Sequence, residues 1–278
     1  MTQVLITGAN GFLGRALVKA CVQQGWTVDV VLNNATGNPE SGIRNILKAD
    51  NLKDQKDEYT YIFHVAAFIP YGAYNTPDER MLSANVVLAL SLHQYFPSAK
   101  VVYASSVSVY GNNTGLLSES SDTVSPTMYG LSKLAGEMIV AHHAKYAIVR
   151  FSSLYGNGMY QGTFIPRVIQ NAKSTGIINL LGTGERQQNY LHIADAAAYC
   201  IQAALHGNNE IYLGVSQTPY SNKEVAEVIA ANVPGCAIQY TGTDNSASFL
   251  YNNTKTTDTL KFTPQVSLQQ GIKELINE

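Results

Sequence analysis

The sequence predicts an α/β protein with a doubly wound parallel sheet and a smaller C-terminal lobe, and two observations carry this prediction. Short runs rich in β-branched residues alternate with helical patterns through the first two thirds of the chain. Such alternation is typical of parallel strands joined by crossover helices. After Tyr155 the chain changes to shorter periodic segments separated by glycines, which indicates a looser lobe.

The elements follow in order along the chain. Five apolar runs predict parallel strands, at residues 4–6, 28–32, 59–65, 101–104 and 147–150. A helix with apolar residues at three- and four-residue steps is expected between the first two strands, and Gly25 ends it. A second helix is expected over 129–141, with an apolar seam formed by Leu131, Leu134, Ala135 and Met138. Further on, residues 210–213 predict a strand, and 222–232 and 267–277 predict helices.

Composition excludes several classes of protein. With 278 residues, 45% of them hydrophobic, the chain can bury a large core, so it is not disordered or fibrous. Only 14% of residues are charged, the net charge is -2, and no basic run occurs, which argues against binding to nucleic acid or an anionic membrane. No apolar stretch approaches the roughly 18 residues of a membrane span, and no leader pattern is evident, so we expect a cytoplasmic protein. Three cysteines without C-x-x-C spacing predict neither a disulfide framework nor a metal site.

A glycine-rich turn joins the first predicted strand to the first helix. Gly8, Gly11 and Gly14 stand three residues apart in this turn. A pyrophosphate at a helix N-terminus needs exposed backbone N–H groups with no Cβ in the way, and the last glycine lets the helix pack closely on the strand. The strand, turn, helix and next strand together predict a dinucleotide-binding unit of the Rossmann type.

The identity of the dinucleotide is less sharply predicted. The second strand ends near Asn33, where a carboxylate would bind the ribose of NAD or an arginine would bind the 2′-phosphate of NADP. Neither stands there, Asn33 can hydrogen-bond either form, and Arg44 is too far along the sequence to place. NAD and NADP both stay open, with a slight lean to NADP. Asp50, after the expected third strand, is either an acceptor for the adenine amino group or a solvated acid.

Tyr129 and Lys133 are the centre of the predicted chemistry. Residues four apart on a helix lie on one face, so the phenol and the ammonium can reach a common ligand. A phenol with a pKa near 10 is a poor acid or base at neutrality, and a fixed lysine cation would lower its pKa. Alone, such a pair is usually a surface pair, but a serine-rich segment, 105–111, follows the fourth strand, where a doubly wound sheet builds its ligand crevice.

With these motifs in order, the chain resembles the extended short-chain dehydrogenases/reductases, in the NAD-dependent epimerase/dehydratase group that acts mostly on nucleotide sugars. The resemblance covers nearly the whole chain and rests on T-G-x-x-G-F-L-G at 7–14, Asp50 and Leu52, H-V-A-A at 64–67, Asn85-Val86, S-S-x-x-V-Y-G at 105–111, Tyr129 with Lys133, R-F-S-S-L-Y-G at 150–156, G-T-G at 182–184 and H-I-A-D at 192–195.

The resemblance implies a role for each matching residue. It makes Tyr129 the acid/base, Lys133 its partner and a donor to the cofactor ribose, and Ser106, rather than Ser105, the hydroxyl that orients the substrate. It also implies a cofactor site formed by Gly8, Gly11, Phe12, Leu13, Gly14, Asp50, Leu52, Ala66, Ala67, Asn85 and Phe151. A homodimer through the helix of Tyr129 and its neighbour is implied as well.

Three departures from the family pattern limit the substrate. Val107 and Ser108 stand where the 4,6-dehydratases of the family place an Asp-Glu pair, so a dehydratase is not expected. Gln188 replaces an arginine that often binds the substrate diphosphate, although Arg186 is two residues away. Ser153 replaces an asparagine that often contacts substrate. We predict that the substrate is bound by Ser106, Ser153, Arg186 and Gln188.

We therefore predict an NAD(P)-dependent oxidoreductase that transfers a hydride at a hydroxyl or keto carbon of a nucleotide sugar, as an epimerase or a 4-ketoreductase, with Tyr129 as acid/base. The alternative is an NADPH-dependent carbonyl reductase on a non-sugar substrate, and a remote one is a non-catalytic dinucleotide-binding protein. Residues 1–157 and 186–217 are assigned to the dinucleotide-binding domain, and 158–185 and 218–278 to the substrate-binding lobe.

Overall fold

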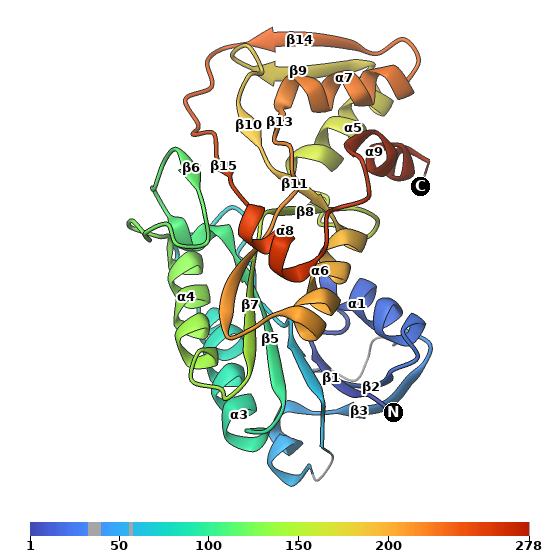
Figure 1. The fold of residues 1–278 in the computed structure, drawn as a ribbon. Helices are drawn as coiled ribbons and strands as arrows, with labels where there is room; N and C mark the ends of the chain where they lie inside the picture. The colour runs from blue at the N-terminus through green and yellow to red at the C-terminus, as the bar shows by residue number, and fades with distance from the viewer. Residues whose placement is uncertain (33–39, 56–57, 278) are drawn as a thin grey trace.

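A seven-stranded parallel sheet forms the body of the computed structural model, which describes residues 1–32, 40–55 and 58–277. The strand order is β12-β7-β5-β4-β1-β2-β3 (Figure 1). The strands are β1 (Gln3–Thr7), β2 (Thr27–Val31), β3 (Ile43–Leu47), β4 (Tyr61–His64), β5 (Lys100–Ser106), β7 (Tyr146–Phe151) and β12 (Glu210–Gly214). The predicted doubly wound sheet is confirmed, because the strand order reverses between β1 and β4.

Both faces of the sheet are buried except at its edge strand β3, which explains why the other strands have continuous apolar sequences instead of alternating ones. In β1, Val4 and Ile6 pack in the core on the side of helices α1 and α6, while Leu5 packs on the other side under α3 and α4. The helices are α1 (Phe12–Gln23), α2 (Glu79–Leu82), α3 (Leu88–Tyr95), α4 (Met128–Val140), α5 (Phe164–Thr175), α6 (Ile193–His206), α7 (Asn222–Asn232), α8 (Thr254–Leu260) and α9 (Leu268–Ile276).

A second core lies beyond one end of the sheet, in the upper part of Figure 1. It joins α5, α7 and α9 to a two-stranded parallel sheet, β9 (Ile177–Leu181) with β14 (Ala237–Thr241). Three further short pairs link distant parts of the chain: β8 (Ser153–Tyr155) with β11 (Tyr190–His192), β10 (Gln187–Gln188) with β13 (Tyr220–Ser221), and β6 (Leu116–Leu117) with β15 (Leu250–Tyr251). Among the described residues, no helix has both the length and the apolar character needed to cross a membrane.

Helix α4 packs on the sheet with a polar face, although an apolar seam on another face was predicted to be buried. Leu131 and Met138 of the seam are 45% and 64% exposed, while Lys133 and Glu137 are buried. The polar face can approach the sheet because Gly136 has no side chain: a Cβ there would lie 2.2 Å from the hydroxyl oxygen of Tyr103. The predicted apolar seam is therefore divided: Leu131 and Met138 face outward, while the half-buried Leu134 packs against a small buried cluster.

A segment near the C-terminal end of the structure, β15 to α8, packs on the lower body of the molecule (Figure 1). Helix α8 packs on α6 and β12, and Leu260 is part of the core there. The buried Thr256 hydroxyl donates to the Glu119 carboxylate at 2.6 Å and accepts from the backbone N–H of Leu213 at 2.7 Å. These contacts hold the segment from β15 to α8 against the lower body of the molecule. The division that assigns residues 218–278 to the smaller lobe stays a prediction.

Candidate active site

A cavity of about 1010 Å³ lies at the C-terminal ends of the central strands, between the sheet and the upper core. Its floor is the turn after β1, one side is the segment after β4, and the other is formed by residues after β5, β7 and β8. Of the predicted site residues, it is lined by Gly8, Gly11, Phe12, Leu13, Gly14, Ala66, Ala67, Ser106, Tyr129, Lys133, Phe151, Ser153 and Gln188. The ends of parallel strands therefore bring together motifs that lie far apart in the sequence, as the crevice rule for such sheets predicts.

The turn after β1 has no room for side chains at two of its glycines. Gly8 has a φ of +73°, and a Cβ there would lie 2.5 Å from the Cα of Ala66. A Cβ at Gly14 would lie 2.0 Å from the carbonyl oxygen of Gly8. Gly11 precedes α1 and supplies no side-chain cap to it, and the residues of this first turn, 11–14, line the cavity. This cradle fits the pyrophosphate of a dinucleotide.

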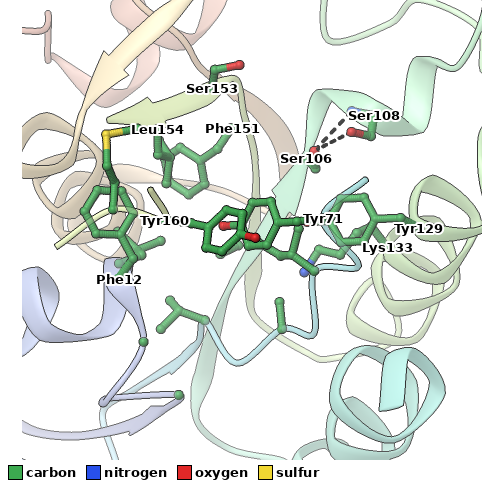
Figure 2. Close-up of a pocket in the computed structure, with 18 of the residues that line it drawn as sticks. Phe12, Tyr71, Ser106, Ser108, Tyr129, Lys133, Phe151, Ser153, Leu154 and Tyr160 are labelled. Carbon is green, nitrogen blue, oxygen red and sulfur yellow. Dashed lines mark hydrogen bonds between the residues drawn. The ribbon is translucent and has the colours of Figure 1, made fainter. Parts of the chain in front are cut away.

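Tyr129 and Lys133 lie on the buried face of α4, next to each other in the cavity (Figure 2). The Thr127 hydroxyl caps the helix by accepting from the Gly130 N–H at 3.2 Å. The Lys133 ammonium lies 4.3 Å from the centre of the Tyr103 ring, and its Nζ has no hydrogen-bond partner among the described residues. An orphaned buried donor that lines a cavity is available to a ligand.

Burial dominates the electrostatics of this pair. It lowers the pKa of Lys133 to about 7, against the opposing effect of the Glu137 carboxylate. Burial also raises the pKa of Tyr129 well above its ordinary value; the Tyr71 and Tyr74 phenols add to this rise, and the Ser106 hydroxyl opposes it. The expected depression of the Tyr129 pKa by lysine is therefore absent from the protein without ligands, because desolvation of the phenolate outweighs the other effects.

The two neighbouring serines after β5 have different surroundings. Ser105 also lines the cavity, but its hydroxyl donates to the buried Glu137 carboxylate at 2.5 Å and is therefore engaged inside the fold. Ser106 lines the cavity and accepts from the backbone N–H of Ser108 at 3.1 Å, while its hydroxyl donates to the Ser108 hydroxyl at 3.0 Å (Figure 2). This geometry favours Ser106 over Ser105 as the residue that faces a substrate.

A buried ion pair that the sequence analysis missed holds α4 in place. The Arg150 guanidinium on β7 donates to both oxygens of Glu137 at 2.9 and 2.7 Å, and both side chains are about 5% exposed or less. Glu137 lies one helical turn after Lys133, on the same face. The four-residue spacing could have indicated this ion pair, because a third polar residue on a buried helix face needs a charged or hydrogen-bonding partner.

Other predicted residues lie outside the cavity lining. Asn85 is buried one layer behind, where its side-chain amide donates to Ser132 on α4 at 2.9 Å. Arg186 donates to the Ala247 carbonyl at 3.3 Å and does not line the cavity. Asp50 is exposed and Leu52 is buried in the core, and neither lines the cavity. Asn33 lies outside the described residues.

The lean toward NADP is not supported. Arg44, the one arginine weighed for the 2′-phosphate, is held by Asp29 on the neighbouring strand β2: its Nε donates to that carboxylate at 2.9 Å, and a second nitrogen forms an ion pair with it. The Tyr59 hydroxyl and the Asn45 N–H also donate to Asp29. Arg44 thus stabilises the edge of the sheet.

The fold and the site together define an NAD-dependent enzyme of the extended short-chain dehydrogenase/reductase class, with a dinucleotide cradle at one end of the cavity and a serine, tyrosine and lysine at the other. The chain belongs to the NAD dependent epimerase/dehydratase family, whose model matches residues 4–213.

Several relatives are named for activities on nucleotide sugars. A putative UDP-glucose 4-epimerase of Methanocaldococcus jannaschii is 24% identical, with 99% of this chain and 97% of that protein aligned. A UDP-N-acetyl-alpha-D-glucosaminuronate decarboxylase of Bacillus cytotoxicus is 26% identical, over 98% and 96% of the two chains. Among solved structures, MoeE5 in complex with UDP-glucuronic acid and NAD superposes with a TM-score of 0.83 at 26% identity, covering 99% of this chain and 98% of that one.

Proposed function

We propose that the protein transfers a hydride between NAD and a hydroxyl or keto carbon of a nucleotide sugar, as an epimerase or a 4-ketoreductase, with Tyr129 as the acid/base. The observation that supports this most strongly is the convergence of Tyr129, Lys133 and Ser106 at one end of a cavity whose other end is a dinucleotide cradle. Relatives that act on nucleotide sugars support the substrate class.

The residues present fit a bound dinucleotide. Gly8, Gly11 and Gly14, with the first N–H groups of α1, would hold the pyrophosphate, and Ala66 and Phe151 would pack against the rest of the molecule. The orphaned Nζ of Lys133 would donate to the nicotinamide ribose. When bound, the nicotinamide serves as the hydride carrier.

Proton transfer falls to the chain's own residues. The Ser106 hydroxyl, fixed by Ser108, would hold the substrate oxygen against the Tyr129 phenol. Tyr129 would give its proton to that oxygen in reduction and take it back in oxidation. Tyr129 carries its proton at neutral pH, which is the state that reduction requires, although its raised pKa makes it a weaker acid than a free phenol.

The diphosphate of the substrate has a separate place. Helix α5 begins at Phe164 after Thr163, whose side chain makes no cap, and Thr163, Phe164 and Ile165 line the cavity. Free N–H groups in the first turn of a helix bind phosphate. Gln188 and Ser153 add polar groups nearby, and Arg186, which contacts Ala247 instead, would need to turn to join them.

Elimination of water is not part of the proposed reaction. Of the described residues that line the cavity, none is an aspartate or a glutamate. Ser108, in the position where the family's dehydratases carry a carboxylate, is hydrogen-bonded to Ser106. Tyr129 is therefore the proposed proton donor, and the described lining holds no pair of carboxyl groups that could serve as the additional acid and base of a dehydratase.

We also propose a homodimer through α3 and α4. The exposed face of α4 carries Leu131 and Met138, and the neighbouring segment from α2 to α3 exposes Leu82, Val87 and Leu90, each at least 45% exposed. Figure 1 shows both helices on one flank of the sheet. Apolar surface of this kind is typical of an interface between subunits.

The test begins with mass spectrometry of the nucleotide released when the purified protein is denatured, followed by titration with NADH and NADPH. Retained NAD favours the epimerase, because its cofactor does not leave between turnovers. An empty protein favours the ketoreductase. Activity is then assayed on UDP- and dTDP-sugars with Tyr129→Phe and, as a matched control, Tyr240→Phe, a distant exposed tyrosine on β14. Unchanged turnover in Tyr129→Phe would refute the mechanism.

A further inference from the structure

Two tyrosine rings stack on each other inside the cavity, close to Tyr129. Tyr71 comes from the segment after β4, and Tyr160 from the segment between β8 and α5, so the pair joins the two sides of the cavity. Their ring centres are 4.2 Å apart and their planes differ by 20°. Figure 2 shows the pair in the middle of the cavity, with Phe12 on one side and Tyr129 on the other.

The local structure holds both rings in this position. Tyr71 stands in a tight turn in which its N–H donates to Ile69 at 3.0 Å and the Ala73 N–H donates to Pro70 at 2.8 Å. The Tyr160 ring folds back over Gly162, where a Cβ would lie 2.5 Å from the ring. Position 162 therefore requires glycine for the ring to lie as it does.

The rings present surface that no other part of the described chain covers. Tyr71 is 42% exposed and Tyr160 is 53% exposed, although both line the cavity. Rings 4.2 Å apart leave no room for a third ring between them. A substrate ring that reaches Tyr129 past the pair must cover an outer ring face or replace one of the two tyrosines, and in both cases it contacts an aromatic face.

The charge of the cavity lining limits what that ring can carry. Lys133 is the one charged side chain among the described lining residues, and it lies buried above the Tyr103 ring on the helix of Tyr129. Around the tyrosine pair the lining is aromatic, apolar or hydroxyl-bearing. A carboxylate beside the pair would give up part of its hydration and find no second cation in the described lining, because Lys133 is assigned to the cofactor ribose.

We propose that the Tyr71–Tyr160 pair is the subsite for the sugar ring of the substrate, and that it selects an uncharged hexose over a hexuronic acid. This assignment rests on the proposed function and adds the class of sugar to it. The ring faces of the two tyrosines supply the contact, and the position of the pair beside Tyr129 places the reacting carbon near the acid/base.

The test is isothermal titration of the protein, saturated with NADH, with UDP-glucose, dTDP-glucose and UDP-glucuronic acid. Saturation with NADH prevents turnover, because these sugars carry no keto group to reduce. UDP-glucose or dTDP-glucose should bind at least tenfold more tightly than UDP-glucuronic acid. Tyr71→Ala and Tyr160→Ala should each weaken binding of the neutral sugar nucleotide by about five- to tenfold. Tyr160→Phe, which keeps the ring face, should bind within about twofold of wild type.

Two controls separate contact from folding. The affinity for NADH and the melting temperature should be unchanged in every variant, and Tyr240→Ala should bind as wild type does. Equal binding by the alanine variants, or binding of UDP-glucuronic acid as tight as that of UDP-glucose, would overturn the subsite and leave the proposed function standing. Failure of all three nucleotide sugars to bind the NADH-loaded protein would overturn UDP- and dTDP-sugars as substrates of the proposed function, and the subsite with them.

Discussion

The buried pair Glu137–Arg150 should be one of the strongest single determinants of stability in the body of the molecule. Glu137→Leu leaves the Arg150 guanidinium in a site where its side chain is 5% exposed, and also removes the acceptor of the Ser105 hydroxyl. Removing one partner of a buried pair typically costs about 3–5 kcal/mol. Replacing both partners with apolar residues of similar volume is often neutral, so Glu137→Leu with Arg150→Met should lie within about 2 kcal/mol of wild type.

Urea unfolding followed by the fluorescence of Trp26, the single tryptophan, measures these free energies, because Trp26 stacks on Phe63 of the sheet. The matched control is the exposed pair Lys255–Glu210, 2.9 Å apart, where Lys255→Met should cost less than about 1 kcal/mol. The reasoning is refuted if Glu137→Leu costs no more than the control with an unchanged m-value, or if the double variant is less stable than the single one.

Three other predictions follow from the site and the surface. Because the pKa of Lys133 falls from 10.5 unfolded to about 7 folded, the unfolded chain binds more protons between these values. The contribution of Lys133 to the free energy of unfolding should therefore increase as pH rises through this window, and Lys133→Met should lose that increase in pH-dependent urea melts. Gly14→Ala should weaken NADH binding more than tenfold in a fluorescence titration, since a Cβ would meet the Gly8 carbonyl at 2.0 Å. Gly25→Ala places a side chain at a φ of +72° with no atom within 4 Å, so it should lower the free energy of unfolding and leave that affinity unchanged. Leu131→Asp with Met138→Asp should halve the mass found by light scattering, and a wild-type monomer would contradict the dimer.

The sequence was sufficient for six of the seven strands and for the ligand end of the sheet, because apolar runs and glycine spacing are local signals. The edge strand β3 was not among the predicted apolar runs, since the polar Arg44 and Asn45 interrupt its sequence, IRNIL. The strand at 210–213 and the helix at 222–232 were predicted in the right places, as β12 and α7. The glycine turn, Ser106, Tyr129 and Lys133 could also be placed, since the C-terminal ends of parallel strands share one edge.

Features that depend on tertiary packing were out of reach. The buried face of α4 was not predicted correctly from its apolar seam. Lys133 and Glu137 are buried because they find partners on β5 and β7, which the local sequence does not show. The pKa of Tyr129 rises instead of falling, since no sequence pattern reports the desolvation of a phenol. The contact between Tyr71 and Tyr160, 89 positions apart, was likewise absent from any local pattern.

The fastening of β15 and α8 to the lower body has a consequence for synthesis. Thr256 and Leu260 complete contacts with Glu119, with β12 and with the sheet core, although they follow every strand of the central sheet in the sequence. Glu119 lies in the segment that connects the serine-bearing end of β5 to the helix of Tyr129. A nascent chain that has completed all seven strands therefore still lacks the contacts that support this connection, and a fragment ending near residue 217 would carry the cofactor motifs without a finished reaction centre.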